Sequence, residues 1–223
     1  MCGRFVSVNE KKIIEKSFNI SKTKNFLEKS YNVAPGQKIN AILNNNKELI
    51  LDSLNWGYSF YSKKNNKDQT IINSRIETIN SKFLFKDSFL KRKCIILANG
   101  YYEWQKTKNK NIPYFINIPE LESIFFAGIW RIENRNNIKT PVCCIITKEA
   151  NKKITFIHHR MPIIFSFNEA LLYLNDTSNE FSKNITTTEI EDELDFYEVS
   201  TIVNNPLNMC YKFKIRKTVL NHR

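Results

Sequence analysis

The sequence predicts one domain that combines many short β-strands with a few short helices. Its 223 residues are enough for one well-buried domain, and the length does not require a second. Hydrophobic residues make up 42% of the chain and include 16 Phe and 9 Tyr, so a core can form. Only 5 Gly and 6 Pro are present, which excludes a low-complexity or collagen-like chain. Apolar runs of strand length are separated by polar turns along most of the chain.

The elements of the first half begin with a helix in which Ile and Phe follow Asn9 at helical spacing, so Asn9 is expected to cap it. Pro and Gly in residues 31–37 break this pattern. The expected elements are a helix over 9–18, paired strands over 39–43 and 48–56, an exposed lysine-rich loop over 61–70 and an extended strand over 71–78.

The second half alternates apolar strands with short helical segments, and it contains no repeat and no linker. The basic tail from Tyr211 to Arg223 is expected to be mobile. The expected elements are helices over 83–90 and 168–174, a polar helix and loop over 177–193, and strands over 94–98, 112–118, 123–130, 141–147 and 195–199.

Composition also limits the expected cellular location of the protein, the state of its cysteines and its use of metals or cofactors. No window approaches ~20 consecutive apolar residues, and the N-terminus lacks the layout of a signal peptide, so we expect a cytoplasmic protein without membrane contact. The odd number of cysteines, five, predicts reduced thiols rather than a disulfide framework. Cys143 and Cys144 are expected in the core. Neither C-x-x-C nor H-E-x-x-H occurs, so neither a metal site nor any cofactor is expected.

The net charge of +12 and the pI near 9.4 favour a polyanionic partner such as nucleic acid. The chain is also rich in Lys, Asn and Ile together, which an AT-rich coding sequence produces whatever the function. The charge therefore supports a nucleic-acid partner without establishing one.

The first four residues carry the most specific chemistry. If an aminopeptidase removes Met1, Cys2 presents an amine and a thiol on adjacent carbons. An aldehyde can form a Schiff base with such an amine and then accept the sulfur at the same carbon, which closes a thiazolidine ring. The ordinary pKa values of these groups, about 8 for the amine and about 8.5 for the thiol, allow this near neutral pH. From this stretch alone, an incidental N-terminal cysteine remains an equal alternative.

Three other polar stretches are candidates for a site, each with a structural alternative. Asn73, Arg75 and Glu77 project from one face if residues 71–78 are extended, and the alternative is a solvent-facing strand. Glu103 lies between aromatic residues, where burial would raise its pKa, or else it is a surface residue. For His158 and His159, a catalytic role and a structural role are both open. For Trp56, the alternatives are that its ring stacks on a base or that it belongs to the core.

Six stretches together resemble the SRAP family, the SOS-response-associated peptidase or abasic-site processing proteins, in order and approximate spacing. Each motif alone is weak and the ordered set is specific. The family usually has Ala where Ser74 stands. The stretches are Met-Cys-Gly-Arg-Phe at 1–5, Tyr-Asn-Val-Ala-Pro-Gly at 31–36, Asn-Ser-Arg-Ile-Glu at 73–77, Asn-Gly-Tyr-Tyr-Glu-Trp at 99–104, His-His-Arg-Met-Pro at 158–162 and Val-Ser-Thr-Ile-Val-Asn at 199–204.

The resemblance implies a single α+β domain with a mixed β pseudo-barrel core and flanking short helices. It implies a monomer that binds single-stranded DNA and captures the ring-opened aldehyde of an abasic site on Cys2 as a thiazolidine. Asn73 would orient the adduct, Glu103 would move protons, and His158 would assist ring opening and reversal. Residues expected to contact DNA are Arg4, Trp56, Arg75, Trp104, Arg160, Ser200 and Asn204.

Two other functions remain open. One is an N-terminal-nucleophile hydrolase or autopeptidase, with Cys2 attacking an acyl carbon and Glu103 or His158 as the base. The other is a noncovalent single-strand DNA-binding module in which Cys2 has no chemical role. A Schiff base beside an abasic site also favours β-elimination, so a strand-cleaving lyase activity is expected as a side reaction.

Overall fold

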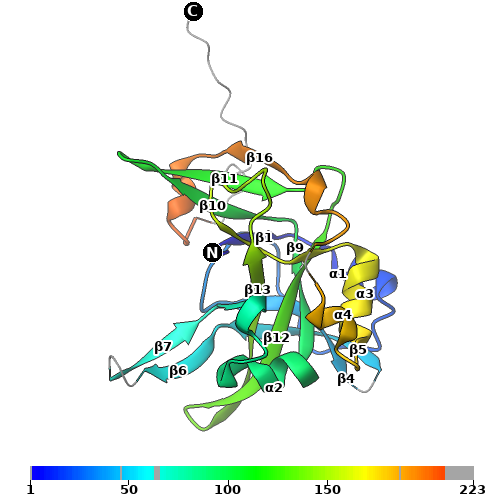
Figure 1. Cartoon of the computed structure of the whole chain (residues 1–223). Helices are drawn as coiled ribbons and strands as arrows, with labels where there is room; N and C mark the ends of the chain where they lie inside the picture. Colours follow the sequence, from blue (N-terminus) through cyan, green and yellow to red (C-terminus); the bar gives the residue numbers. More distant parts are fainter. Residues whose placement is uncertain (1, 46, 63–65, 186, 209–223) are drawn as a thin grey trace, which may run out of the picture.

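The core is a barrel of five strands. The computed structural model describes residues 2–45, 47–62, 66–185 and 187–208, and the basic tail expected to be mobile lies outside them. The parallel pairing of Trp56 with Cys143 joins the first and last strands and closes the ring. This confirms the predicted α+β class with a pseudo-barrel core (Figure 1). Around the ring the strands are β5 (Glu48–Trp56), β4 (Lys38–Asn45), β9 (Lys93–Ala98), β12 (Ile124–Arg135) and β13 (Ile138–Glu149).

Alternation along the barrel strands divides their side chains between two hydrophobic clusters, because successive strand residues point to opposite faces. Ala41 and Ile96 belong to the cluster that also contains Cys2. Their neighbours Ile42 and Ile95 belong to the other cluster, which includes residues of the helices. The strands are therefore apolar on both faces, which explains their continuous apolar runs in the sequence.

A second, antiparallel sheet packs against one side of the barrel, above it in Figure 1. Its strand β1, which lies between β10 and β3, begins three residues after Cys2, and Phe5 pairs with Tyr101. The sheet therefore places the N-terminus against the barrel. Its order is β16 (Asp195–Glu198), β11 (Asn111–Asn117), β10 (Gly100–Lys106), β1 (Phe5–Ser7) and β3 (Ser30–Val33).

Short helices cover the second cluster, to which they contribute Ile14, Phe89 and Tyr173. Ser166 and Glu169 form a capping box at the start of the third helix. Across the described ranges, no helix has the length and apolar content needed to cross a membrane. The helices are α1 (Lys11–Ser17), α2 (Phe83–Lys91), α3 (Phe167–Asn175) and α4 (Glu180–Lys183).

Three local expectations were wrong. The first helix is capped at Glu10 without a side-chain bond, whereas Asn9 is buried and accepts a hydrogen bond from Ser123 at 2.6 Å. The described part of the expected loop over 61–70, residues 61–62 and 66–70, belongs to a hairpin, which looks polar in sequence because most of these residues face solvent. The expected strand over 71–78 turns into a 3-10 helix after Arg75. These elements are β6 (Tyr58–Ser62), β7 (Lys67–Ile71), β8 (Asn73–Arg75) and η1 (Ile76–Thr78).

The other strands and helices follow the predicted pattern with longer bounds. The β12 and β13 strands extend as a hairpin through the polar residues 131–140, for which the sequence predicted no strand. Glu103 follows the buried strand β9 and lies in the next strand, β10. The remaining elements are β2 (Lys22–Thr23), β14 (Arg160–Pro162), β15 (Ile164–Phe165), η2 (Glu191–Glu193) and η3 (Thr201–Asn204).

Candidate functional site around Cys2

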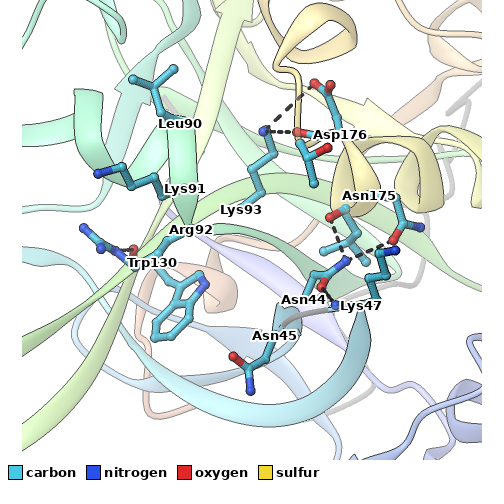
Figure 2. Close-up of a pocket in the computed structure, with 12 residues that line it drawn as sticks. Asn44, Asn45, Lys47, Leu90, Lys91, Arg92, Lys93, Trp130, Asn175 and Asp176 are labelled. Atoms are coloured by element: carbon cyan, nitrogen blue, oxygen red, sulfur yellow. Dashed lines mark hydrogen bonds and ion pairs between the residues drawn. The ribbon is translucent and has the colours of Figure 1, made fainter.

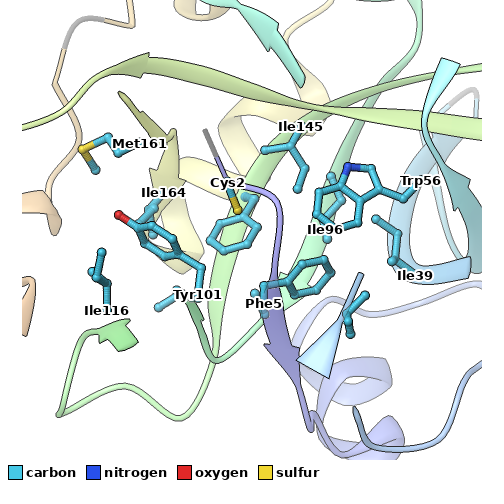
Figure 3. Close-up of a cluster of buried hydrophobic side chains, with 14 of the residues drawn as sticks. Cys2, Phe5, Ile39, Trp56, Ile96, Tyr101, Ile116, Ile145, Met161 and Ile164 are labelled. Carbon is cyan, nitrogen blue, oxygen red and sulfur yellow. The ribbon is translucent and has the colours of Figure 1, made fainter. Parts of the chain in front are cut away.

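Cys2 lies between the two sheets, inside the first hydrophobic cluster. Its side chain is fully buried near Phe5, Trp56 and Tyr101 (Figure 3). Burial raises the pKa of the Cys2 thiol far above its usual range, and the nearby charge of Glu103 raises it further. The thiol therefore keeps its proton until a base removes it or an electrophile is bound.

Asn73 connects the barrel to the N-terminus. It lies on β8, which runs parallel to β13 with Asn73 opposite Ile145. Its Nδ2 donates a hydrogen bond of 2.8 Å to the Cys2 carbonyl oxygen. Its Oδ1 is buried and has no hydrogen-bond partner among the described residues. The amide thus fixes the position of Cys2 with one end and offers a ligand an acceptor with the other.

Glu103 lies on β10 and is only 5% exposed. It projects from the same face of the strand as Tyr101, which belongs to the Cys2 cluster. Burial raises the pKa of the Glu103 carboxyl. The structure therefore supports the buried interpretation of this residue over the surface one. A carboxyl whose pKa is raised toward neutrality can both accept and donate a proton near physiological pH.

His158 precedes β14 and is half-buried. Its Nδ1 lies 2.9 Å from the backbone nitrogen of Arg160, which donates to it. In the neutral ring, Nε2 therefore carries the proton. Chiefly because of burial, the pKa of His158 is lowered to about 4, so the ring is neutral at physiological pH. His159 stacks on it with ring centroids 4.4 Å apart.

Four of the residues expected to contact DNA lie together on the second sheet. The guanidinium of Arg4 lies 5.8 Å from the ring centroid of Trp104. The indole Nε1 of Trp104 donates to Oδ1 of Asn204 at 2.8 Å. Asn204 lies in the 3-10 helix η3. Ser200 caps the start of this helix and accepts a hydrogen bond from the Ile202 backbone nitrogen. This cluster joins the N-terminal strand to the last described segment of the chain.

Asn32 supports this cluster, and the sequence analysis gave it no role. It is fully buried on β3. Its Oδ1 accepts from Nη1 of Arg4 at 2.8 Å, and its Nδ2 lies 2.8 to 3.3 Å from the carbonyl oxygens of Val203, Asn205 and Asn208. A buried asparagine inside the Tyr-Asn-Val-Ala-Pro-Gly motif was the available sequence signal, because a buried polar side chain needs partners.

The other residues expected to contact DNA differ in their access to solvent. Trp56 is 1% exposed and its Nε1 donates to the Ile72 carbonyl oxygen at 3.0 Å, so its ring offers no face to a base. It is a core residue, the alternative left open by the sequence. Arg160 is also buried and forms an ion pair with Glu77. Arg75 is exposed and free to meet a phosphate group.

The described residues form no metal-binding cluster, and a large cleft lies away from Cys2. Within the described ranges, no group of three or more His, Cys, Asp or Glu side chains is placed to hold a metal ion. A cleft of about 970 Å³ lies among Asn44, Lys93, Trp130 and Asp176 (Figure 2). None of the four residues expected to be catalytic lines it, so the cleft is separate from the Cys2 site.

A buried cysteine at the second position, with the Asn73 amide on its carbonyl oxygen and the Glu103 carboxyl near its thiol, defines a cysteine site between a β-barrel and a second sheet. The chain belongs to the SOS response associated peptidase (SRAP) family, which matches residues 1–206. This confirms the family resemblance of the sequence.

Two relatives with curated names cover 93% and 80% of this chain. The abasic site processing protein YoaM of Bacillus subtilis is 33% identical over 215 residues, which covers 93% of this chain and 95% of YoaM. The abasic site processing protein HMCES of Xenopus tropicalis is 26% identical and is covered over 63% of its length. A solved protein from Bacteroides thetaiotaomicron has a TM-score of 0.82 over 97% of this chain and 100% of its own, at 19% identity, and shares the fold.

Proposed function

We propose that this protein binds single-stranded DNA at an abasic site and forms a covalent thiazolidine between Cys2 and the ring-opened sugar, which shields the lesion. The proposal is supported by the names of the relatives, which are abasic site processing proteins, and by the net charge of +12. An abasic sugar is an aldehyde carried on a polyanion. It therefore suits both the aminothiol and the basic protein.

The observation that carries the proposal is the hydrogen bond of 2.8 Å from Asn73 to the Cys2 carbonyl oxygen. A buried main-chain carbonyl needs a donor in any protein, so the informative feature is the other end of the same amide. Asn73 lies on β8, beside the barrel strand β13, and its Oδ1 has no partner among the described residues, so it is left for a ligand next to the residue that would react. The buried carboxyl of Glu103 is close enough to affect the pKa of the Cys2 thiol.

The reaction balances without an oxidant or reductant. Once Met1 is removed, the Cys2 amine adds to the aldehyde carbon and one water leaves, which gives a Schiff base. The sulfur then bonds to the same carbon, and the thiol proton passes to the nitrogen. Glu103 is assigned this proton transfer, because its raised pKa allows it to take the proton from the thiol and return it to the nitrogen.

The other side chains around Cys2 are assigned to the sugar and to the DNA. Asn73 Oδ1 would accept a hydrogen bond from the sugar hydroxyl or from the thiazolidine nitrogen. The neutral ring of His158 would assist ring opening and reversal of the crosslink. Arg75 would contact phosphate, and Trp104 would stack on a base or wall the pocket. Lyase cleavage of the strand is a side reaction that ring closure suppresses.

The test mixes the purified protein with a single-stranded oligonucleotide that carries one abasic site, and with an intact control strand, on a denaturing gel. The expected result is a shifted band with the abasic strand only, without borohydride. Cys2→Ala abolishes the band and retains noncovalent binding, since phosphate contacts supply most nonspecific affinity. An equal band from Cys2→Ala would refute the chemistry.

Glu103→Gln separates proton transfer from binding. The variant keeps the size of the side chain and removes its capacity to exchange a proton. We expect slower crosslinking, by a factor of roughly 10² to 10⁴, with unchanged affinity for the strand. A time course of the gel band measures the rate. An unchanged rate would remove Glu103 from the mechanism.

Two other activities are outcomes of the same experiments. Mass spectrometry of the mature N-terminus shows whether Met1 has been removed. A retained Met1 would block the aminothiol and favour a noncovalent single-strand binding module. Removal of Met1 that depends on Cys2, in protein made without an aminopeptidase, would support the autopeptidase activity.

A further inference from the structure

We infer that Glu77 is a positioning residue: through its ion pair with Arg160 it holds His158 in place against the strand that carries Asn73. The inference rests on the proposed function for its consequence in the reaction. Its structural part concerns only the described contacts. Neither the sequence motifs nor the proposed reaction gives Glu77 a role.

The ion pair has the geometry of a rigid connection. Arg160 Nη1 lies 2.7 Å from Oε1 of Glu77, and Nη2 lies 3.0 Å from Oε2. This bidentate arrangement fixes the plane of the guanidinium as well as its distance. Arg160 is buried while the Glu77 side chain is 45% exposed, so the carboxylate closes the solvent side of the guanidinium.

The same arginine holds the turn that carries His158. The Arg160 backbone nitrogen donates to Nδ1 of His158 at 2.9 Å, which determines the tautomer and orientation of the ring. Nη2 of Arg160 also donates to the Thr147 carbonyl oxygen at 2.7 Å. Arg160 thus contacts His158 through its backbone, and Glu77 and Thr147 through its side chain, so one residue links the ring to the ion pair.

The network continues to the strand of Asn73. Thr147 is fully buried on β13, and its Oγ1 donates to the carbonyl oxygen of Ser74 at 3.0 Å. Ser74 follows Asn73, and Glu77 lies in η1 directly after the same strand. One set of contacts thus joins β8, β13 and β14 and determines how far His158 lies from Asn73.

This arrangement gives Arg160 a different task from the one expected from sequence. Both of its terminal nitrogens have protein partners, so a phosphate would have to displace Glu77 to reach them. Without Glu77, the guanidinium would stay buried and lose its counter-charge, which is unfavourable. Loss of the carboxylate is therefore expected to loosen the His158 turn rather than to improve DNA binding.

The first test is an NMR titration of His158 in Glu77→Gln. In the unchanged protein, burial lowers the His158 pKa to about 4, and the charges of the amino terminus, His159 and Lys106 lower it too. A looser turn admits water, so the pKa is expected to rise toward 6.5 in Glu77→Gln. Glu120→Gln removes the same charge from an exposed position and should leave it unchanged. A pKa of about 4 in folded Glu77→Gln would overturn the inference.

The second test is a double-mutant cycle on the rate of crosslinking to the abasic oligonucleotide. Glu77→Gln is expected to slow the reaction about tenfold, within the range of couplings between neighbouring residues. If Glu77 acts through His158, the double variant with His158→Gln is no slower than His158→Gln alone. Glu77→Asp keeps the charge and should restore part of the rate. Additive effects in the cycle would refute the positioning role.

Binding of an uncrosslinkable oligonucleotide with a reduced abasic site separates the two possible tasks of Arg160. The dissociation constant of Glu77→Gln and its salt dependence should match the unchanged protein. Tighter binding, with the slope against log salt steeper by about one phosphate contact, would mean that Arg160 binds DNA once it is released, and would overturn the inference. If the unchanged protein forms no crosslink, the proposed function fails while the titration still tests Glu77.

Discussion

Replacing Asn32 with alanine should destabilise the protein without changing any predicted catalytic residue. Asn32 is fully buried and is the point where β3, Arg4 and the last described segment meet. Alanine removes both ends of the amide. The Arg4 guanidinium and the carbonyl oxygens of Val203, Asn205 and Asn208 then each lose a partner.

The size of the expected stability loss follows from the number of protons on Asn32 Nδ2, and not from the number of oxygens near it. Nδ2 carries two protons for three carbonyl oxygens, so it makes two full hydrogen bonds, and the longest contact, 3.3 Å to Val203, is the weakest. Two neutral bonds contribute about 1 kcal/mol each, and the bond from the charged Arg4 contributes about 1.5 to 3 kcal/mol. Arg4 keeps its second bond, to the Val203 carbonyl oxygen at 2.9 Å. The three lost bonds sum to about 3.5 to 5 kcal/mol, and because Arg4 keeps this other bond we expect a loss at the lower end, about 3.5 kcal/mol.

Urea unfolding measures this loss. With a slope of roughly 2 to 3 kcal/mol/M, the midpoint should fall by about 1.2 to 1.8 M. Asn205→Ala is the matched control, because Asn32 contacts only the backbone of that residue, and it should cost less than about 1 kcal/mol. A loss from Asn32→Ala as small as that of the control would refute the argument that this amide fastens the C-terminal segment.

Two further predictions concern titration and backbone strain. Between pH 8 and about 5.5 the ring protons of His158 should not shift in NMR spectra, because its folded pKa of about 4 lies below the unfolded value of 6.5. Its contribution to stability is present above pH 6.5 and is lost as the pH falls toward 4, and a ring that titrates near 6.5 would contradict this. Gly100→Ala should lower the free energy of unfolding by more than 2 kcal/mol, roughly, since the new Cβ would lie 2.3 Å from Cζ of Phe115 at a φ of +144°. Gly36→Ala has a φ of +84° but open space, so it should cost less in the same urea assay.

The sequence was informative about the fold class and the family. It was much less informative about which side chains contact each other. Buried strands appear as apolar runs, and six motifs in order are specific, so both predictions were confirmed. The partner of Arg160 lies 83 residues away, and the Val203 carbonyl bound by Arg4 lies 199 residues away. An arginine looks the same in sequence whether it faces a phosphate or a carboxylate, so only the fold separates Arg75 from Arg160.

The hairpin of β6 and β7 shows the same limit for secondary structure. Pairing depends on the backbone, and a strand with few buried residues lacks the apolar pattern that reveals it. Within this hairpin, Tyr58 is buried and the guanidinium of Arg131 lies 4.2 Å from its ring centroid. That anchor comes from β12, and no local feature of residues 61–70 signals it.

The order of synthesis gives the position of Cys2 a further meaning. Cys2 is made near the start of synthesis, but Asn73, Glu103 and His158 come from the middle and later parts of the chain, and the carbonyl of Val203 that holds Arg4 comes near the end. Under the proposed function, a nascent chain from which Met1 has been removed would carry an aminothiol without the groups that orient an aldehyde. The assembled site would exist only after almost all of the chain has been made, which would delay its selective reactivity until folding is complete.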